Sequence, residues 1–145
     1  MDNVLALDAH FYFVGSIVRR EASSHHDILD GMISRGIITL IDPADISALQ
    51  YLSLLAEHEL GEGETECITF ATMQEIIVAT DDARARKVIL SLLGKERLTG
   101  SLGLLLRCIS SGRIVIQDAQ NAYDEMRRAG AFLPNILLKE FIKID

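Results

Sequence analysis

Short apolar runs, rich in β-branched and aromatic residues, alternate along the chain with longer segments whose apolar residues recur every three to four positions. This alternation is typical of βα units built around a parallel sheet. The apolar runs predict strands at residues 10–14, 37–41, 76–80 and 97–99. The pattern therefore predicts an α/β fold of three layers, α/β/α, with helices on both faces of one mainly parallel sheet.

The helical segments are bounded by residues that start and stop helices. Asp42 and Pro43 predict the start of a long helix that runs to Leu60, because Pro pre-sets the first helical φ and Asp can cap free amides. Its inward stripe is expected to be Ile46, Leu49 and either Leu52 or Leu55. Other helices are predicted over 16–22 and 26–35, in the segment after the GEGE turn, after Asp82, from Ser101 to Arg107, from Asp118 to Ala129 and from Leu133 to Ile142.

Length and composition indicate one domain over residues 1–145. The chain is 49% hydrophobic and 24% charged, which is ordinary for a globular protein that buries one core. No apolar stretch approaches the length of a membrane span and the first residues do not read as a signal peptide, so a cytoplasmic protein without membrane contact is expected. Cys67 and Cys108 lie in apolar helical stretches without metal-ligand spacing, and we interpret them as reduced core residues.

The formal net charge of −7 argues against a broad surface that binds nucleic-acid phosphates, because such surfaces need clustered Lys and Arg. It does not exclude a nuclease. A carboxylate cluster that recruits a divalent metal ion is itself negative until the ion binds.

Three groups of acidic residues stand where a parallel sheet places its ligands, just after a strand or at the start of the next helix. Asp81 and Asp82 directly follow the apolar run IIVAT. Glu64 and Glu66 stand two positions apart at the start of a helix, and Glu21 follows the first strand. Carboxylates drawn from separate segments are the ligands that Mg²⁺ and Mn²⁺ prefer.

Each of these acids also has a purely structural interpretation. Asp81 or Asp82 can be a helix cap, which is an equally common role for Asp at a helix start. The helix dipole favours Glu64 in a first turn, and Glu21 beside Arg19 and Arg20 is typical of a solvated ion-pair partner. The pattern alone leaves both interpretations open.

Several linked motifs resemble one branch of a known family. The strings LGEGETECITFA, IIVATDDARARKV, LTGSLGLLLRCISSGRI and MRRAGAFL follow one another in this order between residues 54 and 133. They are similar to the toxin-related branch of the PIN-domain proteins, whose members carry a GEAEAI-type helix, a strand that ends in Thr-Asp-Asp, and a helix that starts with Gly-Thr/Ser-Leu-Gly.

The resemblance implies a ribonuclease that uses acidic residues around Mg²⁺ or Mn²⁺ to hydrolyse RNA. It implies an antitoxin-like protein as a possible further partner. Separately, the apolar C-terminal helices lead us to expect a homodimer. By motif position, the resemblance assigns catalytic roles to Glu21, Glu66 and Asp82, metal contacts to these three and to Glu64 and Asp81, and substrate binding to Ser101.

The chain departs from the family in one respect that bears on activity. The family opens with a strand that ends in an Asp, whereas this sequence begins at what corresponds to the following helix. Asp8 stands in a helical stretch and is a poor substitute. We therefore expect either a start codon assigned too late or a protein that has lost catalysis. The alternatives to a ribonuclease are a non-catalytic PIN-fold module for interaction or dimerisation, and an unrelated α/β binding protein.

Overall fold

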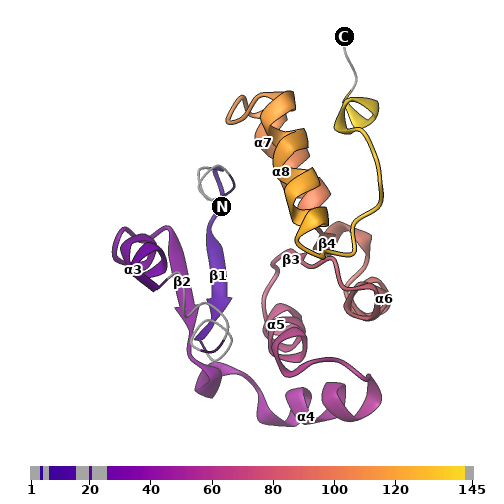
Figure 1. The fold of residues 1–145 in the computed structure, drawn as a ribbon. Helices are drawn as coiled ribbons and strands as arrows, with labels where there is room; N and C mark the ends of the chain where they lie inside the picture. The colour runs from indigo at the N-terminus through magenta and orange to yellow at the C-terminus, as the bar shows by residue number, and fades with distance from the viewer. Residues whose placement is uncertain (1–3, 5–6, 16–19, 21–25, 143–145) are drawn as a thin grey trace.

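A computed structural model describes residues 4, 7–15, 20 and 26–142, and Figure 1 shows the path of the chain. The helix predicted over residues 16–22 lies largely outside the described residues, and so does Glu21.

All four predicted strands are present in the structure, and they pair in parallel. Strand β1 (Phe11–Val14) pairs with β2 (Ile38–Ile41), so that Phe11 lies opposite Ile38 and Val14 opposite Ile41. Strand β3 (Val78–Ala79) pairs with β4 (Leu98–Thr99). Within the described part of the chain these are two separate two-stranded sheets, not the one continuous sheet that the pattern predicted.

The helices connect and cover these strands. Their bounds are α3 (His26–Ser34), η2 (Pro43–Asp45), α4 (Ala48–Glu57), α5 (Glu62–Met73), α6 (Ala83–Leu92), η3 (Lys95–Arg97), α7 (Ser101–Ser110), α8 (Ile116–Arg128) and η4 (Leu138–Phe141), where η denotes a 3₁₀ helix. The predicted α/β class is confirmed.

The long helix predicted from Asp42 to Leu60 is wrong, because the chain breaks it in two. Asp42 does accept the amide of Ala44, as predicted, but it caps only the short 3₁₀ turn η2. Ile46 is then extended, and Ser47 starts α4 by accepting the amide of Gln50.

This break also rotates the buried face of α4. The helix turns Leu54 inward, while Leu49 and Leu52 are 78% and 59% exposed. Two of the positions expected on the inward stripe therefore face solvent.

Three helix ends differ from the sequence prediction. Gly100, not Ser101, is the cap residue of α7, and Ser101 is its first helical residue. Helix α8 begins at Ile116, two residues before Asp118, and the helix predicted from Leu133 shrinks to η4. Pro134 and the exposed Leu137 lie in an irregular segment instead.

Helix α5 joins two hydrophobic cores because two adjoining faces of it are apolar. Ile68 and Ala71 pack with Val78 of β3 and with Ile89 of α6. Cys67 and Phe70 pack on another face against the cluster at the ends of β1 and β2. Figure 1 shows the β1–β2 pair with α3 on one side of α5 and the β3–β4 pair with α6 on the other, and α5 contacts both β1 and β3.

A third cluster attaches the last part of the chain. Tyr123 of α8 is fully buried with Leu105 of α7 and Leu138 of η4. The Tyr123 hydroxyl donates to the Pro134 carbonyl at 3.0 Å, so the irregular segment is tied to α8. This cluster fixes α7, whose first turn lies at the ends of β3 and β4.

Candidate functional site

A pocket of about 370 Å³ opens at the carboxyl end of β3, where it meets the first turn of α5. Its floor is apolar and comes from β3, α5 and α6, and its rim carries charged side chains. The lining residues are Arg20, Gly61, Glu62, Gly63, Glu64, Cys67, Ile68, Val78, Ala79, Thr80, Ala85 and Ile89. The volume falls within the range of small-ligand sites.

The charged rim is built around the start of α5. Glu62 forms an ion pair with Arg20 at 2.8 Å, and both side chains are more than half exposed. A Cβ added to Gly61 would lie 2.3 Å from Glu64 Oε2, which means that the Glu64 carboxylate folds back over the first turn. Helix amides favour negative charge at that position. Glu64 is thus placed as its structural interpretation expects.

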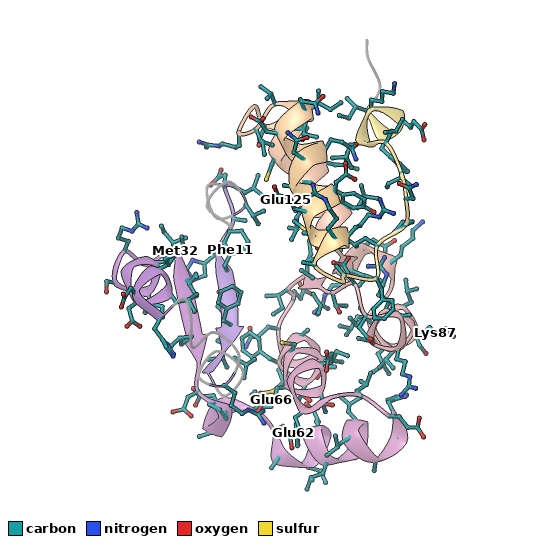
Figure 2. All side chains as sticks on the ribbon, viewed as in Figure 1. Phe11, Met32, Glu62, Glu66, Lys87 and Glu125 are labelled. Atoms are coloured by element: carbon teal, nitrogen blue, oxygen red, sulfur yellow. The ribbon has the colours of Figure 1, made fainter. Side chains whose placement is uncertain are left out.

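Glu66 stands two positions after Glu64 on α5 and is partly buried. Burial raises the pKa of Tyr51, and the charges of Glu62 and Glu66 raise it further while that of Arg20 lowers it. Figure 2 shows Glu62 and Glu66 at the end of α5 nearest α4.

Asp82 acts as the cap of α6. Its Oδ1 accepts the amide of Arg84 at 2.9 Å and the amide of Ala85 at 2.8 Å. Two otherwise unpaired amides are thereby satisfied. Asp82 therefore has the structural role of a helix cap, and one of its two carboxylate oxygens is used to cap α6.

Asp81 reaches across to α7 instead. Its Oδ1 accepts the Ser101 amide at 3.0 Å, and its Oδ2 accepts the Ser101 hydroxyl in a short hydrogen bond. The predicted substrate-binding hydroxyl of Ser101 is thus donated to Asp81. Both carboxylate oxygens hold the first turn of α7 against the end of β3.

Arg86 also binds at the carboxyl ends of β3 and β4, and it was not among the residues that the sequence pointed to. Its Nη1 donates to the carbonyls of Thr80 at 2.8 Å and Thr99 at 3.1 Å, which ties together the ends of β3 and β4. The sequence did not point to Arg86 because it lies one turn inside α6 and does not follow a strand directly. Its spacing of four residues from Asp82, on the same side of a helix, is the only hint in the sequence.

Gly100 is required at this corner because its neighbours leave no room for a side chain. A Cβ there would lie 2.4 Å from Asp81 Oδ1, 3.0 Å from Arg86 Nη1 and 3.2 Å from the Thr80 carbonyl oxygen. Gly100→Ala should therefore displace Asp81 from α7 and lower the free energy of unfolding by about 1–3 kcal/mol. Urea denaturation measures this, with Gly31→Ala as the control, since Gly31 is helical and has open space around its Cβ position. Equal changes in the free energy of unfolding for the two variants would contradict the crowding around Gly100.

The predicted metal ligands that the structure describes come from separate elements. No group of three or more His, Cys, Asp or Glu side chains in residues 4, 7–15, 20 and 26–142 is placed to hold a metal ion. Glu64 and Glu66 belong to α5, Asp81 contacts α7, and Asp82 caps α6. Glu21, the third acid of the predicted set, lies outside these residues.

Cys67 lies in the pocket wall between the two cores. Burial raises its pKa to about 11, and the nearby carboxylates of Glu66 and Glu64 add to the effect. The thiol is therefore protonated at neutral pH and is a poor nucleophile. Both cysteines were interpreted from the sequence as reduced core residues; Cys67 is a free cysteine, and Cys108 is fully buried.

The raised pKa of Cys67 has a consequence for stability. The folded chain keeps the thiol protonated above the pH at which an unfolded thiol, with pKa 9.0, ionises. This contribution is complete below pH 9 and is lost as the pH rises to about 11. Melting curves should show that Cys67→Ala flattens the loss of stability over this window, because the tyrosines still titrate in both proteins. Parallel curves for the two proteins would refute the assignment.

Comparison with known proteins supports the fold from a separate direction. The sequence model of the DUF3368 family, described as a PIN domain, matches residues 14–144. Neither the curated proteins nor the solved structures contain a significant match to this chain. None of the described helices is long and apolar enough to cross a membrane. Because the family match spans nearly the whole sequence, the chain belongs to the PIN-domain family.

Proposed function

We propose that this chain is a PIN-domain protein related to metal-dependent ribonucleases in which metal-dependent cleavage of RNA is weak or absent. Family membership supports the relation to nucleases. The observation that supports weak cleavage is the use of the strand-end aspartates. Asp82 caps α6 and Asp81 accepts two hydrogen bonds from Ser101 in the first turn of α7, so both carboxylates are occupied by backbone and hydroxyl donors.

Weak binding of a metal ion is expected from the same geometry. PIN nucleases use Mg²⁺ or Mn²⁺, and Mg²⁺ gives up its water shell reluctantly, so it needs several carboxylates to hold it. The described acids do not supply such a cluster. We propose that any residual metal affinity depends on Glu66 and Asp82, with Glu21, and that it is weak.

Titration with Mn²⁺ tests this proposal without measuring activity. Free Mn²⁺ gives an electron paramagnetic resonance signal that disappears on binding. We expect half-saturation only at millimolar Mn²⁺, and still weaker binding in Glu66→Gln and in Asp82→Asn. Micromolar binding that both substitutions abolish would overturn the proposal, because it would show that the acids converge in solution.

A second function, that of a protein-interaction module, is supported by the exposed face of α4. Leu49 and Leu52 lie one turn apart and are 78% and 59% exposed. Exposed leucines on one helix face are typical of a protein contact. We propose that a second copy of this chain packs against α4, giving the expected homodimer, and that an antitoxin-like protein binds elsewhere.

The α4 contact is tested by sedimentation. The chain should sediment as a dimer at micromolar concentration, and Leu49→Glu should shift it to monomer without lowering its melting temperature. The control is Leu90→Glu, a similarly apolar and half-exposed position on α6. A monomeric parent chain, or a dimer that withstands Leu49→Glu, would rule out this contact.

A further inference from the structure

Phe132 stands at the tip of a turn that follows α8, and it is 98% exposed. Helix α8 ends where Gly130 takes a positive φ of 97°, and the Ala131 amide returns to the Met126 carbonyl. The Leu133 amide then donates to the Ala131 carbonyl at 2.8 Å, which closes a three-residue turn with Phe132 at its centre. The backbone therefore fixes this aromatic residue at the tip of the loop.

The loop after the exposed ring is held in place by side chains of α8. The Tyr123 hydroxyl donates to the Pro134 carbonyl at 3.0 Å, and Arg127 Nε donates to the Leu133 carbonyl at 3.3 Å. Arg127 Nη1 also donates to Asn135 Oδ1 at 2.8 Å. Because these bonds already order the loop, a ligand that packs on the ring loses little affinity to ordering it.

The residues on either side of this turn line a polar hollow of about 420 Å³. Its lining residues are Asp124, Arg127, Arg128 and Asn135. Arg127 is engaged within the hollow, since it lies 3.7 Å from Asp124 and hydrogen-bonds to Asn135. The Arg128 guanidinium is exposed and makes no hydrogen bond or ion pair with the described residues. It is therefore available to an anionic ligand.

The last part of the chain does not share the acidity of the rest. Residues 107–145 contain six Lys and Arg against five Asp and Glu, whereas residues 1–106 contain eight against sixteen. The net charge of −7 therefore comes from the first part of the sequence. A polyanion meets less repulsion from the segment that carries α8 than from the segments before it.

An exposed aromatic ring together with arginine is the combination that binds single-stranded nucleic acid. The ring stacks on an unpaired base, and the guanidinium attracts the phosphate. A duplex hides the faces of its bases, so it offers nothing to the ring. A protein partner would be expected to meet apolar side chains around such a ring, whereas the hollow here is lined by charged and amide side chains.

We propose that the end of α8 binds a short stretch of single-stranded nucleic acid, with a base stacked on Phe132 and a phosphate bound by Arg128. The site extends the proposed function and rests on it only for the expectation that the bound strand stays intact. It uses neither a metal ion nor the acids at the end of β3, so its binding is measurable in a chelator. Cleavage of RNA in Mg²⁺ would refute the weak cleavage proposed above and leave this binding site standing.

Fluorescence anisotropy tests the stacking contact. Labelled oligouridine and oligothymidine strands of about 12 nucleotides are titrated with the full chain in EDTA. We expect saturable binding that falls roughly tenfold in Phe132→Ala and is retained in Phe132→Tyr, which keeps an aromatic ring. The control is Phe141→Ala, a half-exposed aromatic of η4, which should bind as the parent chain does. Figure 1 shows η4 beside the first half of α8, away from this turn, where Gln120 accepts the Leu138 amide.

Salt dependence tests the phosphate contact separately. One phosphate contact to a single strand contributes roughly 0.7 to the slope of the logarithm of affinity against the logarithm of salt concentration. Arg128→Gln should reduce the slope by about this amount, whereas Phe132→Ala should leave it unchanged because stacking releases no counterion. Lys139→Gln, which removes an exposed cation of η4, is the matched control and should change neither the slope nor the affinity.

Four outcomes would overturn the proposal. They are no saturable binding of either strand, binding of a duplex as tight as that of single strands, unchanged affinity in Phe132→Ala, and loss of self-association in Phe132→Ala, which would assign the ring to a contact between two copies. Unchanged melting temperatures establish that the variants fold. Tighter binding of oligouridine supports the site and identifies RNA as its ligand, and equal binding of both strands supports recognition of base and phosphate alone.

Discussion

Replacing Arg97 with methionine should lower the free energy of unfolding by about 3 kcal/mol, the largest effect expected for a single side chain outside the apolar cores. Arg97 ends η3, and its Nε donates to the Ile76 carbonyl at 2.7 Å. Its Nη2 makes short hydrogen bonds to the carbonyls of Ala71 and Gln74. These three acceptors lie at the end of α5 and in the turn that leads to β3.

The effect is large because the carbonyls at a helix end have no partner within the helix. Without the guanidinium, the end of α5 and the start of β3 lose their common donor. Denaturation in urea measures the change. Lys95→Met, an exposed substitution in the same 3₁₀ turn, should stay within about 0.5 kcal/mol of the parent chain. A similarly small change for Arg97→Met would show that the turn between α5 and β3 is stable without the hydrogen bonds of Arg97.

The second large effect concerns Asp81. Asp81→Asn should lower the free energy of unfolding by about 2 kcal/mol, because an amide nitrogen replaces one of the two oxygens that accept from Ser101. If Asp81 belonged to a metal site, the same substitution would raise the free energy of unfolding. Carboxylates crowded together to await a cation repel one another, and replacing one of them often stabilises the fold.

The control for Asp81→Asn is Asp30→Asn, an exposed acid within α3. It should change stability by less than about 0.5 kcal/mol. Ser101→Ala should cause part of the loss seen for Asp81→Asn, and the double variant should lose less than the sum, since both remove the same hydrogen bond. An increase in the stability of the Asp81→Asn protein would indicate repulsion between carboxylates at the end of β3.

The apolar pattern was sufficient to locate the strands. The runs that predicted residues 10–14 and 37–41 became β1 and β2 within one residue, because β-branched and aromatic residues suit an extended, half-buried backbone. Their pairing into two sheets was not predictable, because it depends on which strands come to lie side by side on α5.

The α4 region shows where periodicity fails. The apolar residues from Ile46 to Leu55 recur at helical spacing, but Ser47 is a cap and restarts the helix. Each later side chain is then rotated from its predicted direction, which exposes Leu49 and buries Leu54. A cap inside an apolar run changes the buried face without changing the pattern.

The strand-end position of Asp81 and Asp82 was predicted correctly, but their partners were not. Capping of α6 by Asp82 is a local interaction and was foreseen as an alternative. The contact from Asp81 to Ser101 spans 20 positions and exists because the Tyr123 cluster holds α7 in place. Whether Glu66, Asp82 and Glu21 meet around a metal ion stays a prediction.

Cleavage of single-stranded RNA by the 145-residue chain tests the central claim most directly. The parent chain, Glu66→Gln and Asp82→Asn would be compared in millimolar Mg²⁺ and in millimolar Mn²⁺, with a chelator as blank. We predict that all three proteins leave the RNA as intact as the chelated sample does. Robust cleavage by the parent chain that disappears in both variants would contradict the account, because it would show that these carboxylates form a working metal site.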